Sequence, residues 1–305
     1  MDLTRVVAIA NGKGGVGKTS LVANLAGEFA YAGAKVLVVD LDVSGNLKLD
    51  LGTVNHEQDD AGGSIYRAIT EGAPLEVVKN VRPGIDWLPG GARLNWIIPM
   101  TYMAGVPLAQ GSVDDSWRQS LSDLIEAEGY DMVLLDCPPG SRELQQMALA
   151  TARWVVVPMK SDPASWEGLQ MLGPLVKTVR QQSNPDLAWL GMAIFGHQST
   201  ATRVLQTVRD NLGADSDLLL FDSTIRSSES AAQACRMRGL LVRELAATVS
   251  TDSRDRLEAL AARRTDPSVV IPETVSPTST SLADDYTSLA NEIGTRILDL
   301  EGAQR

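Results

Sequence analysis

Short apolar runs alternate with stretches of helical periodicity along most of the chain. The apolar runs lie at Val6–Ala10, Val36–Val39, Tyr130–Leu135, Trp154–Pro158 and Leu187–Phe195. Because strands that are covered on both faces are apolar throughout, these runs predict the buried strands of a parallel sheet. The stretches between them place apolar residues three or four positions apart, which predicts connecting helices. The pattern therefore predicts an α/β fold with a doubly wound, mostly parallel sheet and helices on both faces.

Helical periodicity is clearest in five stretches, namely Thr19–Ala32, Ser116–Glu128, Ala164–Gln181, Thr200–Leu212 and Leu282–Leu300. Two intervals lack it. Residues 96–113 mix aromatic residues and methionine with glycine and proline, which predicts a packed excursion and a candidate partner-binding surface. Residues 265–281 are rich in Pro, Ser and Thr, which predicts a loop. We expect residues 1–305 to form a single domain, with helix 282–300 returning to the sheet.

Composition narrows the class of protein. The chain has 305 residues, of which 44% are hydrophobic, and a formal net charge of −11. The negative charge argues against nucleic-acid binding through overall charge, so a DNA contact needs a local basic surface. No uncharged apolar run approaches about 18 residues, and the first residues fit no signal peptide. We therefore expect a cytoplasmic protein.

A glycine-rich loop follows the first apolar run and precedes the first helical stretch. Residues Gly12 to Thr19 match G-x-x-x-x-G-K-[ST], and a strand followed by a loop and a helix start is the context that this motif needs. Glycines let the backbone N–H groups approach phosphate oxygens, Lys18 supplies a charge for the β- and γ-phosphates, and the Thr19 hydroxyl suits Mg²⁺. The expected phosphate-binding residues are Gly12, Lys13, Gly14, Gly15, Val16, Gly17, Lys18, Thr19 and Ser20.

A dinucleotide site is the alternative for the same loop. Gly12, Gly14 and Gly17 also spell G-x-G-x-x-G, and an acid follows at Asp40, near the spacing that a dinucleotide motif expects. The Lys18-Thr19 pair favours a nucleoside triphosphate with a cation, because a bound dinucleotide requires neither residue.

Acidic residues follow two of the apolar runs. Asp40 and Asp42 come after Val36–Val39, and Asp136 ends the run that begins at Tyr130. Because the carboxyl ends of parallel strands meet at the ligand crevice, we expect these acids to lie beside the phosphate loop. Carboxylates at that edge suit the surroundings of Mg²⁺.

Three motifs together resemble the ParA/MinD family of ATPases. The string Lys13-Gly-Gly-Val-Gly-Lys-Thr19 is similar to the deviant Walker A motif of that family, and Asp136-Cys-Pro-Pro-Gly140 is similar to its switch II. The stretch Asp40–Asn46 resembles its switch I, Asp-x-Asp-Pro-Gln-Gly-Asn, with Val43-Ser44 in place of Pro-Gln. The resemblance, which is closest to ParA-type partition ATPases, implies ATP hydrolysis with Mg²⁺ and weak intrinsic turnover.

The resemblance also implies residue roles. Thr19 and, through water, Asp136 would hold Mg²⁺, with Asp40 supporting that arrangement. Asp42 would position the attacking water, and the Gly140 N–H would approach the γ-phosphate. Lys18 would neutralise charge in the transition state, whereas Lys13 would reach across a dimer interface to the partner's nucleotide.

The implied biology is DNA partition by an ATP-dependent homodimer that binds DNA non-specifically. A centromere-binding or cargo-adaptor protein would stimulate hydrolysis, and the protein would be associated with the nucleoid. Residues 226–264 hold eight arginines against five acids, a local net charge of +3. The candidate DNA contacts are Arg226, Arg236, Arg238 and Arg243.

Three other functions compete with DNA partition. A positioning ATPase for a non-DNA cargo is barely separable by sequence from a DNA-partition ATPase. A MinD-like membrane switch is weakened because the last 17 residues have two arginines against three acids, so we expect no stable membrane binding. An iron–sulfur relative is excluded because Cys137 and Cys235 stand alone and cannot supply the ligands.

Overall fold

The computed structural model describes residues 3–103, 108–160, 163–197, 219–263, 270 and 278–303. Within them, eight strands form one sheet in the order β3-β4-β2-β5-β1-β6-β7-β8. The strands are β1 Val6–Ile9, β2 Val36–Asp40, β3 Val78–Arg82, β4 Ile85–Leu88, β5 Met132–Asp136, β6 Trp154–Met159, β7 Ala188–His197 and β8 Leu220–Arg226. All neighbouring pairs are parallel except β3–β4, which is antiparallel. The predicted doubly wound, mostly parallel sheet is confirmed.

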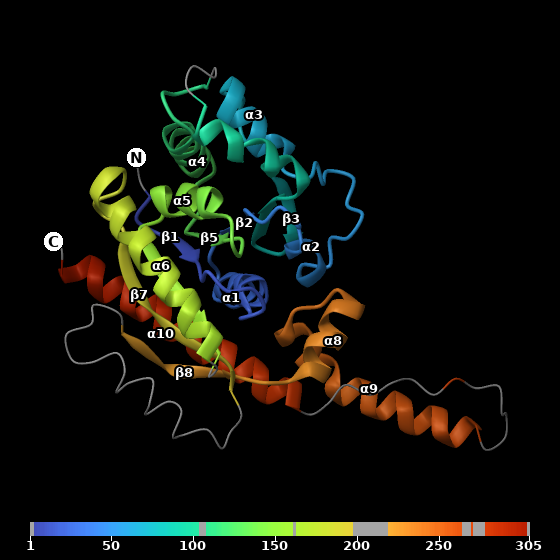
Figure 1. The fold of residues 1–305 in the computed structure, drawn as a ribbon. Helices are drawn as coiled ribbons and strands as arrows, with labels where there is room; N and C mark the ends of the chain where they lie inside the picture. Colours follow the sequence, from blue (N-terminus) through green and yellow to red (C-terminus); the bar gives the residue numbers. More distant parts are fainter. Residues whose placement is uncertain are drawn as a thin grey trace.

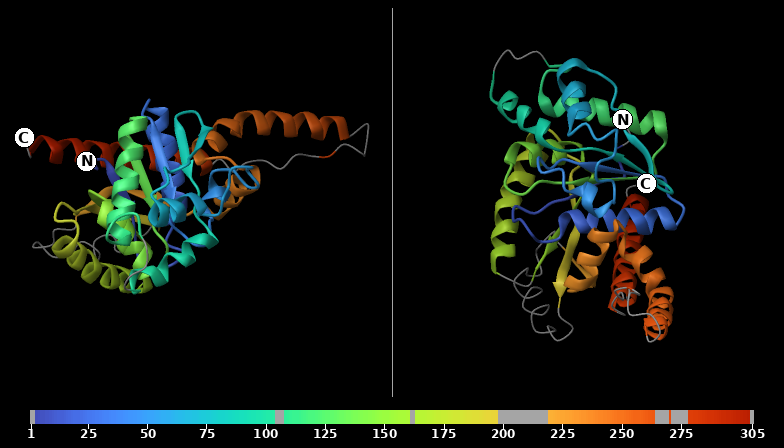
Figure 2. Two further views of the ribbon diagram at one scale, coloured as in Figure 1. Left: turned by 90° about the horizontal axis from the view of Figure 1, so that it is seen from above. Right: turned by 90° about the vertical axis from the view of Figure 1, so that its right-hand side faces the viewer.

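Helices cover both faces of the sheet (Figures 1 and 2). One apolar core lies under α3 Gly63–Glu71, α4 Val113–Glu128, α5 Arg142–Thr151 and α6 Pro163–Gln182. The other lies under α1 Lys18–Tyr31, α2 Leu47–Asp50, α8 Glu229–Arg238, α9 Val242–Arg263 and α10 Thr278–Ala303. The far end of α9 extends beyond the rest of the molecule (Figure 2). None of the described helices combines the length and the apolar character that crossing a bilayer requires.

Some elements differ from the expectations. The edge strand β3 was not predicted, because its sequence Val-Lys-Asn-Val-Arg contains no apolar run. Helix α5 was also missed, although Ser141 caps its start. The last helix begins at Thr278, so the loop expected over 265–281 is wrong for its final residues; most of that interval and the helix expected at 200–212 lie outside the described residues.

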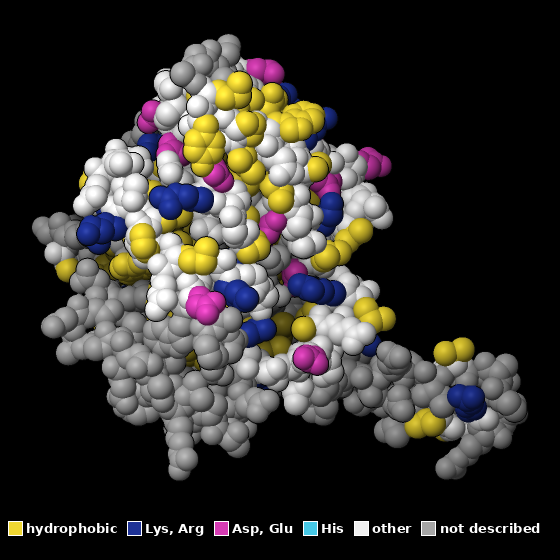
Figure 3. Space-filling model, viewed as in Figure 1, with side chains coloured by type: hydrophobic (Ala, Val, Ile, Leu, Met, Phe, Trp, Pro, Cys, Tyr) yellow, Lys and Arg dark blue, Asp and Glu magenta, His cyan; other side chains and the backbone are white. Residues whose placement is uncertain are grey.

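The excursion after β4 is built of two 3-10 turns, η1 Ala92–Trp96 and η2 Ile98–Thr101. Leu94 and Ile97 are buried, whereas Trp96, Tyr102 and Met103 are 54%, 71% and 60% exposed. Hydrophobic side chains gather in the upper part of the molecule in Figure 3. Residues 92–103 thus pack against the core, and residues 104–107 lie outside the described part. The excursion over 96–113 and its partner-binding role stay predictions.

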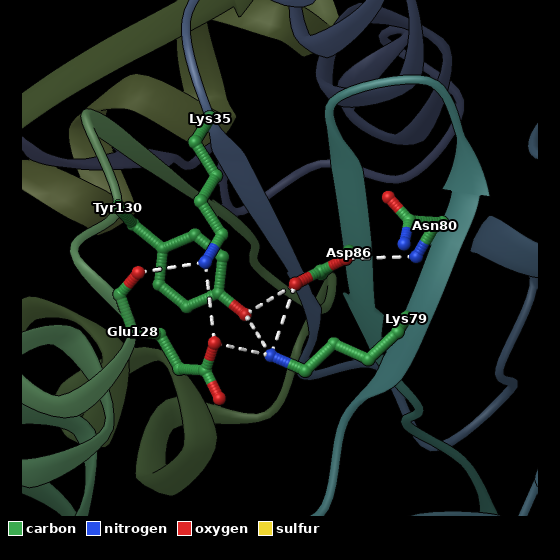
Figure 4. Close-up of polar contacts among 6 residues, drawn as sticks. All are labelled: Lys35, Lys79, Asn80, Asp86, Glu128 and Tyr130. Carbon is green, nitrogen blue, oxygen red and sulfur yellow. Dashed lines mark hydrogen bonds and ion pairs between the residues drawn. The ribbon is translucent and has the colours of Figure 1, made fainter.

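A polar cluster lies at the sheet edge opposite the carboxyl ends of the parallel strands (Figure 4). The buried Asp86 carboxylate accepts a hydrogen bond from the Tyr130 hydroxyl at 2.7 Å and lies 3.2 Å from Lys79 Nζ. Glu128 pairs with both Lys79, at 2.6 Å, and Lys35, at 3.2 Å. These contacts join the β3–β4 hairpin to the chain that enters β2 and β5.

Candidate nucleotide-binding site

The glycine-rich loop connects β1 to α1, as predicted. Gly15 and Gly17 have φ values of 72° and 93°, in the left-handed region that glycine adopts at low cost. The Asn11 side chain fixes the start of the loop, since its Oδ1 accepts from Lys13 N at 2.9 Å and its Nδ2 donates to Pro158 O at 2.9 Å. The loop is therefore tied to β6 and leads directly into the N-terminus of α1, where backbone N–H groups favour an anion.

Close packing around the loop requires glycine at positions 168 and 17. Gly12 N donates to Gly168 O on α6 at 3.3 Å, and a Cβ on Gly168 would overlap Asn11 Oδ1. On the other side, a Cβ on Gly17 would lie 2.5 Å from the ring of Phe195. The loop is thus held between α6 and the end of β7. The sequence carried no signal for either contact, because both join segments that are far apart in the chain.

The two lysines of the loop occupy different environments. Lys18 is buried, and its Nζ donates to Lys13 O at 2.8 Å. Burial lowers the pKa of Lys18, while the charges of Asp136, Cys137 and Asp42 oppose that shift. Lys13 is exposed at the loop surface. Lys18, which faces the site, therefore lies inside the molecule, whereas the exposed Lys13 is available to a second molecule.

Asp40 ends β2 beside the loop and is fully buried. Its carboxylate accepts from Asp42 N at 2.9 Å and from Leu47 N at 3.2 Å. Burial raises the pKa of Asp40 to about 7, although these two N–H groups act in the opposite direction. Asp40 thus shapes the switch I loop through its backbone. The Asp42 carboxylate accepts from Ser44 N at 2.8 Å, within that same loop.

Asp136 ends β5 and is fully buried. Neither of its carboxylate oxygens has a hydrogen-bond partner among the described residues. Burial, followed by the charge of Asp40, raises the pKa of Asp136 well above its ordinary value, and the nearby Thr19 hydroxyl and Lys18 only partly oppose this. An orphaned buried carboxylate beside a hydroxyl and an anion-binding loop fits a hydrated divalent cation.

The described residues contain no group of three His, Cys, Asp or Glu side chains that would hold a metal ion unaided. The donors that are present at this edge, the Thr19 hydroxyl and the Asp136 carboxylate, suit Mg²⁺, which keeps several waters and binds through one or two protein groups together with phosphates.

Switch II leaves β5 and passes under the loop. Cys137 is buried, and burial raises the pKa of its thiol, which fits a packing role and not that of a nucleophile. Gln145 Nε2 donates to Pro138 O at 2.7 Å, and Pro139 lies under Gly14 of the loop. The backbone after Asp136 is therefore fixed close to the phosphate site.

A cavity of about 340 Å³ opens beside the loop. Sequence reasoning missed it, because its walls come from segments that are far apart in the chain. Its lining includes Gly15, Gly17, Ser20, Asp50, Phe195, Ile225, Arg226, Arg236 and Tyr286. A ligand whose phosphates lie in the loop has room for its remaining part here.

The arginines proposed to contact DNA are partly engaged in ion pairs within the protein. Three of them pair with carboxylates: Arg226 with Asp285 at 2.6 Å, Arg236 with Asp50 at 3.3 Å, and Arg243 with Glu28 at 2.9 Å. Arg238 lies in the last turn of α8. The local positive charge is thus partly neutralised within the molecule, and the DNA role of these residues stays a prediction.

Comparison with known proteins places this site in a family. Residues 4–189 match the family described as AAA domain. The chromosome-partitioning ATPase Soj of Thermus thermophilus is 35% identical over 229 residues, which cover 74% of this chain and 84% of Soj. The chromosome partitioning protein ParA of Myxococcus xanthus is 32% identical over 213 residues, which cover 68% of this chain and 71% of that protein.

A solved structure has a similar fold over most of the chain. Cobyrinic acid a,c-diamide synthase from Mycobacterium smegmatis, with bound ADP and magnesium, has a TM-score of 0.62 at 25% sequence identity and covers 88% of this chain and 99% of its own. The sequence matches and this shared fold agree with an ATP-binding domain that takes Mg²⁺. The chain therefore belongs to the ParA/MinD type of P-loop ATPases and is most similar to the ParA partition ATPases.

Proposed function

We propose that the protein is an ATP-hydrolysing partition switch that dimerises with ATP, binds DNA non-specifically and is stimulated by a cargo-bound partner. The observation that carries this proposal is the contrast between the two loop lysines. Lys18 is buried against its own loop, whereas Lys13 is exposed beside it. A cation presented outward from a phosphate loop is suited to the nucleotide of a second copy, and the relatives Soj and ParA are named partition proteins.

The residues present fit ATP with Mg²⁺. Thr19 and, through water, Asp136 would hold the cation, and Asp40 would support them by fixing the backbone of Asp42 and Leu47. When bound, Mg²⁺ neutralises charge on the β- and γ-phosphates. Lys18 and the loop N–H groups stabilise the charge that develops on the phosphoryl oxygens.

Asp42 is the residue that we assign to positioning the attacking water. Its Oδ1 accepts from Ser44 N, which ties the carboxylate to its own loop. Because phosphoryl transfer depends chiefly on positioning, we expect weak intrinsic hydrolysis as long as this loop is not held against the γ-phosphate. A stimulating partner, such as a centromere-binding protein or a cargo adaptor, would act by holding Asp42 and its loop in the productive position.

The nucleoside would occupy the cavity beside the loop. Phosphates held at Gly15 and Gly17 leave the rest of the nucleotide pointing into the space lined by Phe195, Ile225 and Tyr286. Apolar and aromatic walls with a few polar groups are typical of such sites.

The test is co-sedimentation with non-specific DNA in the presence of ATP, ADP or no nucleotide, with anionic liposomes in parallel. We expect binding to DNA with ATP only, weakened steeply by salt because phosphate contacts release counterions. Lys18→Ala should abolish nucleotide binding and DNA binding together. Binding to liposomes instead would favour the membrane switch. ATP-dependent dimerisation without DNA binding would favour positioning of a non-DNA cargo, which the paired arginines leave open.

A further inference from the structure

One buried carboxylate connects the nucleotide site to the arginine-bearing helices. Asp50 ends α2, the short helix that follows switch I directly. One of its oxygens accepts from Ser20 Oγ, beside Thr19, at 3.1 Å, and the other lies 3.3 Å from the guanidinium of Arg236 on α8. Asp50 therefore contacts the phosphate-loop helix and α8 at the same time.

The Asp50–Arg236 pair also forms part of the wall of the cavity beside the loop. Gly15 and Gly17 line the same cavity, so a nucleotide anchored by its phosphates brings its sugar and base toward the pair. Hydroxyl and amino groups of a nucleoside are hydrogen-bond donors, as Arg236 is, and they compete with it for the Asp50 carboxylate.

The backbone around the pair is fixed independently. The guanidinium of Arg82 donates to Leu51 O, just after α2, and to Gly239 O, at the end of α8, and it pairs with Glu244 at 2.9 Å. Gly52 and Gly239 touch so closely that a Cβ on Gly52 would overlap Gly239 O. The ends of α2 and α8 are thus clamped together. Separation of Asp50 from Arg236 therefore requires side-chain movement, not displacement of a helix.

Arg236 is placed to enter solvent when the pair opens. Its side chain is 51% exposed, whereas that of Asp50 is 8% exposed. The guanidinium therefore lies at the surface before the pair separates, and the carboxylate stays inside to meet the nucleotide.

We propose that the Asp50–Arg236 ion pair is a nucleotide-operated latch. Without nucleotide, Asp50 neutralises Arg236; with ATP in the cavity, the pair separates and the free guanidinium binds a DNA phosphate. This proposal rests on the proposed function, because it takes ATP and DNA as the two ligands. It explains why an arginine proposed for DNA is paired with an acid that follows switch I.

The first test is Asp50→Asn, which keeps the shape of the side chain and one acceptor oxygen for Ser20 but removes the charge and the second acceptor that Arg236 uses. Affinity for a non-specific DNA duplex is measured by fluorescence anisotropy with a non-hydrolysable ATP analogue and without nucleotide. We expect the affinity without nucleotide to rise by about fivefold, the increase expected from roughly one additional neutralised phosphate. At a saturating concentration of the analogue the DNA affinity should change less than it does without nucleotide, so the ratio between the two states falls.

The matched control is Glu28→Gln. It frees Arg243 from an equivalent buried carboxylate that is not part of the cavity wall. If loss of a paired carboxylate alone strengthens DNA binding, Glu28→Gln should change the DNA affinity by the same factor with and without the analogue. The latch is wrong if Glu28→Gln changes the ratio of the DNA affinities with and without the analogue as much as Asp50→Asn does.

The second variant, Arg236→Gln, breaks the pair from its exposed side and tests the latch even if Asp50→Asn folds poorly. DNA affinity with the analogue should fall, and the slope of log K against log salt should shrink by about 0.9 for each phosphate that is no longer neutralised. An unchanged slope would show that Arg236 is not the released cation. If the wild-type protein binds DNA only with the analogue and Asp50→Asn keeps the same ratio, the latch is wrong and the proposed function stands. If the wild-type protein never binds DNA, the proposed function fails first.

Discussion

Asp40 and Asp136 lie side by side in register on the neighbouring strands β2 and β5, with both carboxyl groups buried at the end of the sheet. The charge of Asp40 adds to burial in raising the pKa of Asp136. A buried carboxyl group whose ionisation is opposed by burial and by a neighbouring acid makes the ligand-free site unfavourable at neutral pH. A divalent cation at this edge removes that penalty, so the empty state is less stable and the cation binds more strongly.

Asp136→Asn tests this relationship. The raised pKa means that the carboxyl group destabilises the fold increasingly as pH rises above its unfolded value, near 4, and the amide removes this effect. We expect the ligand-free variant to melt about 2–4 °C higher at pH 7.5, which corresponds to roughly 1 kcal/mol. Addition of Mg²⁺ and ATP should stabilise the wild-type protein and not the variant in thermal melts. A lower melting temperature for the ligand-free variant would contradict the interpretation.

Gly168→Ala should damage the phosphate loop from a distance. The added methyl group meets Asn11 Oδ1 and Lys13 N, so the loop must shift. We expect ATP affinity, measured by titration calorimetry, to fall by about tenfold or more, since small displacements of a binding loop have large effects. Gly173→Ala is the matched control on the same helix: its Cβ has no neighbour within 4 Å, and ATP affinity should be unchanged. Equal effects in both variants would point to helix α6 as a whole.

Lys13→Gln separates nucleotide binding from dimerisation. The Lys13 side chain is exposed, whereas its backbone carbonyl and N–H hold Lys18 and Asn11, so the substitution leaves the loop intact. We expect nearly normal affinity for an ATP analogue together with loss of the dimer in light scattering after size-exclusion chromatography. A variant that dimerises and hydrolyses ATP normally would remove Lys13 from the mechanism.

Asp86→Asn should change the pH dependence of stability. Burial raises the pKa of Asp86, but the Asn80 N–H, the Tyr130 hydroxyl and Lys79 outweigh burial, and the net pKa is lowered. A lowered pKa gives stability that is present above the unfolded value, near 4, and is lost as pH falls through the folded value.

The variant should therefore lose about 1–3 kcal/mol of unfolding free energy at pH 7, from charged hydrogen bonds, with a smaller difference at pH 3. Urea unfolding at the two pH values measures it. Lys35→Gln is the control, because Lys35 bonds the partly exposed Glu128 and not Asp86. Lys79 and then Lys35 lower the pKa of Glu128, so this variant should show a pH dependence of the same sign but smaller. A difference that is the same at both pH values would contradict the assignment to Asp86.

The sequence predicted the parts of the fold that depend on local pattern. The strands ending at Asp40 and Asp136 are apolar throughout, and the loop from Gly12 to Thr19 has a fixed spacing, so both could be placed from residues alone. Strand β3 could not, because one edge strand with lysine and asparagine has no periodic signal.

The rest of the site depends on contacts between distant segments. Arg236 reads as a basic surface residue in the sequence, yet it pairs with Asp50 across 186 positions. From the sequence, Gly168 would be expected only to weaken its helix, yet the close packing of the phosphate loop against that helix requires a glycine there. Such pairings follow from the topology of the sheet, and neither segment contains a sequence pattern that predicts them.

The position of β1 in the sheet also determines how the nucleotide site can form during folding. β1 pairs with β5 and β6 and with no described strand that precedes residue 132. The root of the phosphate loop is therefore held by strands that lie far from it in sequence, and contacts of long sequence separation form slowly. We expect the capacity to bind ATP to appear during refolding only once the central strands have paired, and not with the loop and its helix alone.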